Sequence, residues 1–175
     1  MLVFDTGLCG SLIDKIDVVW GRILRAYDQL GTPASERCTY ALCAAIFDKG
    51  RTATPTQYPV IHSKAAVARH CIPAIKIAVQ SMAEWAPAGG YEDAPKFAWA
   101  FEMLSNLTKF YDSIMFHGQW LSDAAAQEAH DCLQAAGVYH QALCTAFLAE
   151  ARQLFYLTEK AHYAQHIAID CLHYT

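Results

Sequence analysis

The stretch LIDKIDVVWGRILRAYDQLG, residues 12–31, decides the fold class of this chain. Its large apolar residues recur every three or four positions: Ile13, Ile16, Trp20, Ile23, Tyr27 and Leu30. This interval matches the 3.6-residue turn of an α-helix, so the pattern predicts a helix over residues 11–30 with one buried face. Gly31 follows at the position where glycine commonly ends a helix.

Helix-start signals recur further along the chain. Thr32 and Pro33 combine a capping residue with a first-turn proline and predict a second helix that ends near Asp48. Ser63 is a capping residue for a third helix, and Pro73 inside that helix predicts a kink.

Two further starts follow in the second half. Asp93 and Pro95 predict the beginning of a fourth helix, which Gly118 closes. Ser122 and Asp123 predict the beginning of a long fifth helix, because both residues stabilise a helix N-terminus.

The end of the chain is again helical in pattern. Thr158 and Glu159 mark either the start of a sixth helix or a bend in the fifth. No stretch shows sustained alternation of apolar and polar residues, which is the pattern of a strand. We therefore predict an all-α fold, a single-domain bundle of about five or six helices over residues 1–175. The end at Thr175 leaves open that the chain is a piece of a longer protein.

Composition bears on the partners of this chain. Hydrophobic residues make up 54% and charged residues 17%, which is an apolar balance for a globular domain. It predicts a large core or an apolar surface covered by a protein partner or by self-association. The net charge of −4 argues against nucleic-acid binding. The longest uncharged run, residues 132–149, is interrupted by polar residues, so no membrane span is expected.

Seven cysteines are present, an odd number with scattered spacing and no CxxC motif. Five of them lie within helical patterns, so we expect reduced thiols that serve mainly as small apolar residues. The amino terminus has no basic residue ahead of its short apolar run, unlike a signal peptide. These features predict a soluble, intracellular protein.

Charge is distributed unevenly along the sequence. Residues 49–83 contain five basic residues and no acidic one, whereas residues 84–150 contain nine acidic residues and two lysines. The predicted helix start at His62-Ser63-Lys64 could hold an anion, because backbone N–H groups and the helix dipole add to the lysine charge. Alternatively, the two segments simply attract each other across the fold.

Motifs of known catalytic chemistry are missing from the sequence. It contains no GxSxG, no HExxH, no phosphate-binding glycine loop and no dinucleotide fingerprint. His70 and Cys71 are adjacent, but neighbouring helical side chains point about 100° apart and cannot form a catalytic pair with each other. No enzyme class is therefore predicted.

His140 falls within the apolar stripe of the predicted fifth helix, where burial is expected. Cys144 lies one turn further on, and the i, i+4 spacing brings the two side chains to one side. They are either a metal-ligand pair or a neutral core histidine next to a cysteine.

The strongest cluster of ligand-type residues lies at the carboxyl end. At about 100° per residue, Glu159, His162, His166, Asp170 and His173 fall within one narrow stripe of a helix. Apolar residues fill the opposite side, so a solvated helix face accounts for the polarity of the stripe. Histidine is nevertheless a mediocre helix former and a common metal ligand.

Three readings of this stripe remain open: a solvated face, a site for zinc or another divalent transition metal, and a pH-sensitive contact surface. The predicted metal ligands are His162 and His166, with Asp170 or His173 as a third ligand. A distance of about 10 Å along the axis between His166 and His173 is the weakest point of the metal reading. The sequence thus favours a non-catalytic helical interaction module, with a metal-binding helical protein as the alternative.

Overall fold

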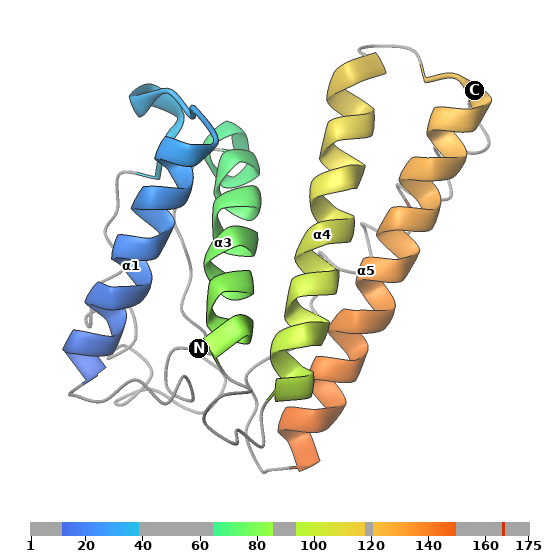
Figure 1. The fold of residues 1–175 in the computed structure, drawn as a ribbon. Helices are drawn as coiled ribbons and strands as arrows, with labels where there is room; N and C mark the ends of the chain where they lie inside the picture. The colour runs from blue at the N-terminus through green and yellow to red at the C-terminus, as the bar shows by residue number, and fades with distance from the viewer. Residues whose placement is uncertain (1–11, 39–64, 86–93, 118–120, 150–165, 167–175) are drawn as a thin grey trace. The chain divides into compact units, whose positions relative to one another are not determined.

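The computed structural model describes residues 12–38, 65–85, 94–117, 121–149 and 166. Within these ranges the chain forms four α-helices and one short 3-10 helix, without a strand (Figure 1). The elements are α1 (Leu12–Gln29), η2 (Ala34–Glu36), α3 (Ala65–Trp85), α4 (Ala94–His117) and α5 (Asp123–Ala149). The prediction of an all-α, bundle-like fold is confirmed.

The chain divides into two compact units, Met1–Ala98 and Trp99–Thr175. The boundary lies inside α4, since Ala98 and Trp99 are both helical. Whether the whole chain behaves as one domain stays a prediction.

In the first unit, α1 and α3 pack side by side and run in opposite directions (Figure 1). The predicted stripe of α1 is confirmed in part: Ile16, Ile23 and Tyr27 are buried, whereas Trp20 is half-buried. The buried residues of α3 are smaller and comprise Cys71, Ala74, Ala78, Val79 and Met82. Burying a large aliphatic side chain stabilises a fold by about 1.5–3 kcal/mol, so this contact holds the helix pair together.

The end of α1 is a Schellman motif around the predicted glycine. Gly31 has a φ of 63°, the left-handed conformation that glycine adopts without steric cost. The Thr32 N–H donates to the carbonyl of Tyr27 at 3.0 Å, and the Gly31 N–H donates to that of Asp28 at 3.1 Å. The chain leaves the helix here, so Leu30 is 45% exposed instead of completing the buried stripe.

The predicted second helix is wrong in its described part. After Pro33 the chain makes only the 3-10 turn η2, which has no side-chain cap, and Arg37 is extended with φ −79° and ψ 149°. Hydrogen bonds from Arg37 to Asp28 and from the Cys38 N–H to the Tyr27 hydroxyl hold the chain away from a helical path. The remainder of that prediction, residues 39–48, lies outside the described residues.

The third helix is confirmed as α3, which continues through Pro73 as far as Trp85. The kink at Pro73 stays a prediction. Ser63, the predicted cap, lies outside the described residues, as does the proposed anion site at His62-Ser63-Lys64.

In the second unit, α4 and α5 form an antiparallel pair (Figure 1). Phe110 of α4 packs with Ala129, Cys132 and Leu133 of α5, and Leu107, Tyr111 and Ile114 cover this cluster. Ser122 caps α5 as predicted, because its hydroxyl accepts the Ala125 N–H at 3.3 Å. None of the described helices has the length and apolar character needed to cross a membrane.

Candidate functional site

Polar side chains of the first unit gather where α1 ends, around η2 and the first turns of α3. Arg37 organises this region. Its Nη1 atom lies 2.7 Å from Asp28 Oδ1, and its Nε atom donates to the Thr32 carbonyl at 2.8 Å. The guanidinium carbon also lies 5.8 Å from the centre of the Tyr27 ring, within the range of a cation–π contact. One side chain therefore fixes the segment that follows α1.

Beneath Arg37, Tyr27 is fully buried, with 0% of its surface exposed. Its hydroxyl accepts the Cys38 N–H at 3.3 Å and is hydrogen-bonded to the Cys71 side chain. Burial, followed by the Cys71 hydrogen bond, raises the pKa of Tyr27 far above its ordinary value. The phenol is therefore neutral at physiological pH.

The Cys71 thiol is also held neutral. Burial is the main cause that raises its pKa, and the hydrogen bond with Tyr27 opposes this only in part. A thiol with a raised pKa is a poor nucleophile, because the thiolate is the reactive form. The arrangement does not favour Cys71 as a catalytic nucleophile.

At the rim of this cluster, His70 reaches in a different direction from Cys71. His70 Nε2 lies 2.9 Å from Glu36 Oε2 and 3.0 Å from Arg69 Nη2. A single ring nitrogen donates to the carboxylate when it carries a proton and accepts from the guanidinium when it does not. The side chains of His70 and Glu36 are 27% and 42% exposed, so this contact lies at the surface. His70 and Cys71 thus contact different residues.

Chemically, this cluster joins η2 to both helices of the first unit. Asp28 and Tyr27 of α1 and the Thr32 carbonyl contact the segment around η2. From α3, His70 contacts Glu36 of η2, and Cys71 hydrogen-bonds to Tyr27. Charged groups lie outside and neutral groups inside, which is the arrangement expected of a structural cluster.

A second polar pair lies on α5. His140 Nδ1 is 3.8 Å from Cys144 Sγ, so the predicted proximity of these two side chains is confirmed. Both are partly buried. Burial lowers the pKa of His140 and raises that of Cys144, so both groups favour their neutral forms.

The predicted metal ligands fall almost entirely outside the described residues. His166 is helical and exposed, as expected for a surface stripe. His162, Asp170 and His173 lie outside the described ranges, as does Glu159. Among the residues that the structure describes, no group of three or more His, Cys, Asp or Glu side chains could hold a metal ion.

Sequence reasoning missed the cluster around Tyr27. Tyr27 was assigned only to the apolar stripe of α1, and Cys38 and Cys71 were treated as small core residues. One signal was available, because a buried tyrosine usually requires a hydrogen-bond partner. Nothing local identifies that partner, since Cys71 lies on another helix.

Comparisons with known proteins do not assign this chain to a group. No family model, no curated protein and no solved structure matches it.

Proposed function

We propose that this protein is a non-catalytic helical interaction module, and that the α4–α5 pair carries its contact surface. The observation behind the proposal is the exposure of large apolar side chains on these two helices. Met115 is 54% exposed, Phe116 87%, Val138 65% and Leu148 61%. The corresponding residues of the first unit, Val18, Leu24 and Leu30, are only 38–45% exposed.

Exposed aromatic residues are costly in water and frequent at the centre of protein interfaces. Phe116 and Met115 are consecutive at the end of α4, so a partner could cover both together. Val138 lies on α5 at about 180° from the buried stripe, which places it on the outward side of that helix. These positions support a contact surface centred on Met115 and Phe116 at the end of α4.

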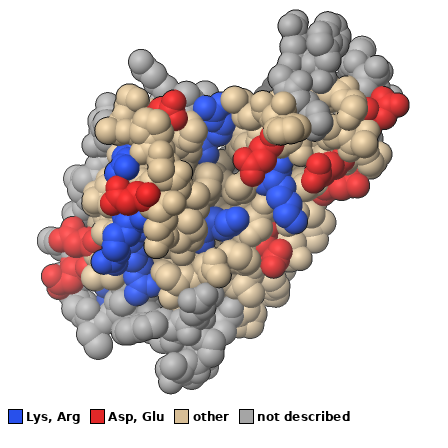
Figure 2. Space-filling view, turned by 45° about the horizontal axis from the view of Figure 1, so that its top comes forward, with Lys and Arg blue, Asp and Glu red and all other residues tan. Residues whose placement is uncertain are grey.

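Charge supports a partner of neutral or basic character. Residues 99–175 contain eight acidic and three basic residues, and opposite potentials favour association. On the face shown in Figure 2, charged side chains of both signs are scattered over a largely uncharged described surface. This distribution suits a protein contact better than the phosphate backbone of a nucleic acid.

The experiment compares Phe116→Ser with Leu24→Ser, a matched control on α1. Sedimentation velocity over a wide concentration range tests self-association of the full chain. We expect association in the parent and in Leu24→Ser, and its loss in Phe116→Ser.

If the parent is monomeric, a photo-crosslinking amino acid is placed at position 116 and, separately, at position 24. A defined protein adduct at 116 in native extract, together with its absence at 24, supports a partner at this surface. A monomeric parent with equal adduct patterns at both positions contradicts the proposal.

Binding of a divalent transition metal is a second candidate function, favoured by the helical, exposed position of His166. His162 and His166 would form the core pair, with Asp170 or His173 as the third ligand. Zinc titration by calorimetry compares the parent with the His162→Ala/His166→Ala double variant. The control is His130→Ala, a histidine of α5 that contacts Asp131 at 3.1 Å. Equal zinc binding by the parent and the double variant contradicts this function.

A further inference from the structure

Cys144 of α5 is the described cysteine that is most open to solvent. Cys38, Cys71 and Cys132 are buried, whereas Cys144 has intermediate exposure. Its Sγ atom lies 3.8 Å from Nδ1 of His140, one turn earlier on the same helix, and His140 is also only partly buried. A small ion can therefore reach this pair of side chains from solvent.

The packing of α5 holds the pair in place. Leu143 and Phe147, which lie next to it on the helix, both have 0% of their surface exposed. At about 100° per residue, His140 lies about 20° from Phe147 around the helix axis, and Cys144 lies about 40° from His140. The pair is thus at the edge of the buried side of α5, on a helix that its core residues keep in position.

The distance between the two side chains suits a shared metal ion. Bonds from a metal to imidazole nitrogen and to thiolate sulfur are about 2.0–2.3 Å long. Two such bonds span about 3.6 Å from nitrogen to sulfur at a tetrahedral angle, and about 4.3 Å when they are in line. The separation of 3.8 Å lies between these values, so one ion can bond to both atoms without a change in the helix.

The protonation states of the two groups are also suitable. Burial lowers the pKa of His140, so its imidazole is neutral and has a lone pair for a metal. Burial raises the pKa of the Cys144 thiol, so this group loses its proton only when an ion replaces it. A metal-bound imidazole normally keeps a hydrogen-bond partner on its other ring nitrogen, so a further contact of His140 is compatible with this role.

The number of ligands decides which ion fits. Zinc sites usually contain at least three protein ligands, and no third His, Cys, Asp or Glu within the described ranges joins this pair to form such a group. Cu(I) is stable with only two ligands in a near-linear arrangement. Thiolate selects this soft ion, and imidazole also suits copper.

We propose that His140 and Cys144 form a two-ligand binding site for Cu(I). The ion replaces the thiol proton, which leaves to solvent, and bonds to Nδ1 of His140 and Sγ of Cys144, while copper stays in the +1 state. This role goes beyond the proposed contact surface and does not depend on it. It is also separate from the divalent site considered at His162 and His166.

The test measures how many Cu(I) ions the full, reduced and metal-free chain withdraws from a coloured bicinchoninate complex without oxygen. Other cysteines also take up Cu(I), so the readout is the difference between proteins. Cys144→Ser and His140→Gln should each withdraw about one Cu(I) fewer than the parent. The double variant should lose no more than either single variant, because the two residues act on the same ion.

Two controls locate the site. Cys132→Ser removes a buried thiol of the same helix and should not remove the equivalent that depends on His140. The His162→Ala/His166→Ala double variant should withdraw as much Cu(I) as the parent, which separates this site from the terminal stripe.

A second measurement uses the unaltered chain, so a variant that fails to fold does not affect the conclusion. Mass spectrometry follows the alkylation of Cys144 by iodoacetamide, and saturating Cu(I) should slow it at least tenfold. Equal rates with and without Cu(I) overturn the proposal. Full Cu(I) uptake by Cys144→Ser or by His140→Gln overturns it as well, since the ion would then not be shared by this pair.

Discussion

At the scale of single residues, Tyr27 is the group whose chemistry the fold alters most. In the unfolded chain its phenol ionises near pH 10, whereas burial in the fold keeps it protonated well above that pH. Its contribution to stability is therefore complete below about pH 10 and is lost as the pH rises further, because only the unfolded chain releases the proton.

This gives a pH prediction for Tyr27→Phe. The parent should lose stability above about pH 10 more steeply than the variant, by up to about 1.4 kcal/mol per pH unit. At neutral pH the variant should be less stable by about 1–2 kcal/mol, since the buried Cys38 N–H loses its acceptor. Urea titrations of both proteins between neutral pH and pH 11 measure the difference. Parallel curves for the two proteins would contradict the buried position of Tyr27.

For His140, burial shifts the pKa in the opposite direction from that of Tyr27. Burial lowers its pKa in the fold, so the folded protein resists protonation and the unfolded chain accepts it near pH 6.5. The stability that His140 contributes is present above about pH 6.5 and is lost as the pH falls below that value.

We therefore predict that His140→Gln makes the second unit less sensitive to acid between about pH 6.5 and pH 5. Thermal midpoints of the parent and the variant, measured across this interval, test the prediction. His130→Gln is the control, because His130 pairs with the exposed Asp131. The idea is contradicted if the control and His140→Gln change the acid response equally.

At the scale of elements, Gly21 within α1 and Gly31 just after it should respond in opposite ways to substitution by alanine. Gly31 has a positive φ, which strains any side-chain-bearing residue, whereas Gly21 lies inside α1 with no atom within 4 Å of an added Cβ. Gly31→Ala should lower the free energy of unfolding by about 1 kcal/mol, and Gly21→Ala should raise it by about 0.5–1 kcal/mol.

Urea unfolding followed by circular dichroism measures both glycine substitutions. The essential result is that the two substitutions change the free energy of unfolding in opposite directions. A stabilising Gly31→Ala would mean that α1 does not end in the left-handed turn.

Local signals predicted the elements that local interactions stabilise. The spacing of Ile16, Ile23 and Tyr27 located α1, and Ser122 located the start of α5, because both patterns act within one helix. The same signals failed after Pro33. There, the contacts of Arg37 with Asp28 and Thr32 override a helix-start pattern, and tertiary contacts of this kind leave no periodic trace in sequence.

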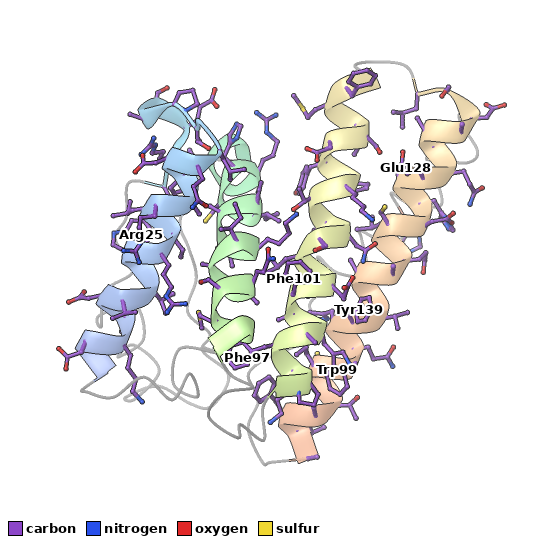
Figure 3. All side chains as sticks on the ribbon, viewed as in Figure 1. Arg25, Phe97, Trp99, Phe101, Glu128 and Tyr139 are labelled. Atoms are coloured by element: carbon purple, nitrogen blue, oxygen red, sulfur yellow. The ribbon has the colours of Figure 1, made fainter. Side chains whose placement is uncertain are left out.

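The candidate sites likewise divide into contacts within one helix, which the sequence predicts, and contacts between helices, which it does not. The proximity of His140 and Cys144 could be predicted, since an i, i+4 spacing within one helix is sufficient. The convergence of Cys38 and Cys71 on Tyr27 could not, because it depends on how α1 and α3 pack. In the second unit, the hydrogen bond from Ser113 to Glu128, the latter labelled in Figure 3, likewise joins different helices and has no sequence signature.

At the scale of the whole molecule, the central question is whether the two compact units unfold together. The boundary between Ala98 and Trp99 lies within a continuous helix, so no loop separates the units at that point. Helix formation is cooperative along the chain, and unfolding on one side of the boundary should weaken α4 on the other. This favours one transition, and the single domain stays a prediction that unfolding measurements can test.

Two core substitutions test this cooperativity. Ile23 of α1 is 3% exposed and Leu133 of α5 is 7% exposed, so Ile23→Ala and Leu133→Ala should each cost about 2–5 kcal/mol. We expect each substitution to shift a single urea transition, seen equally by circular dichroism and by tryptophan fluorescence, with the slope of the transition unchanged. The surface variant Leu24→Ser, at 38% exposure, should shift it by much less. If each core substitution instead separates an early transition from an unshifted one, the units are independent domains, because destabilising one core would then leave the other at its original stability.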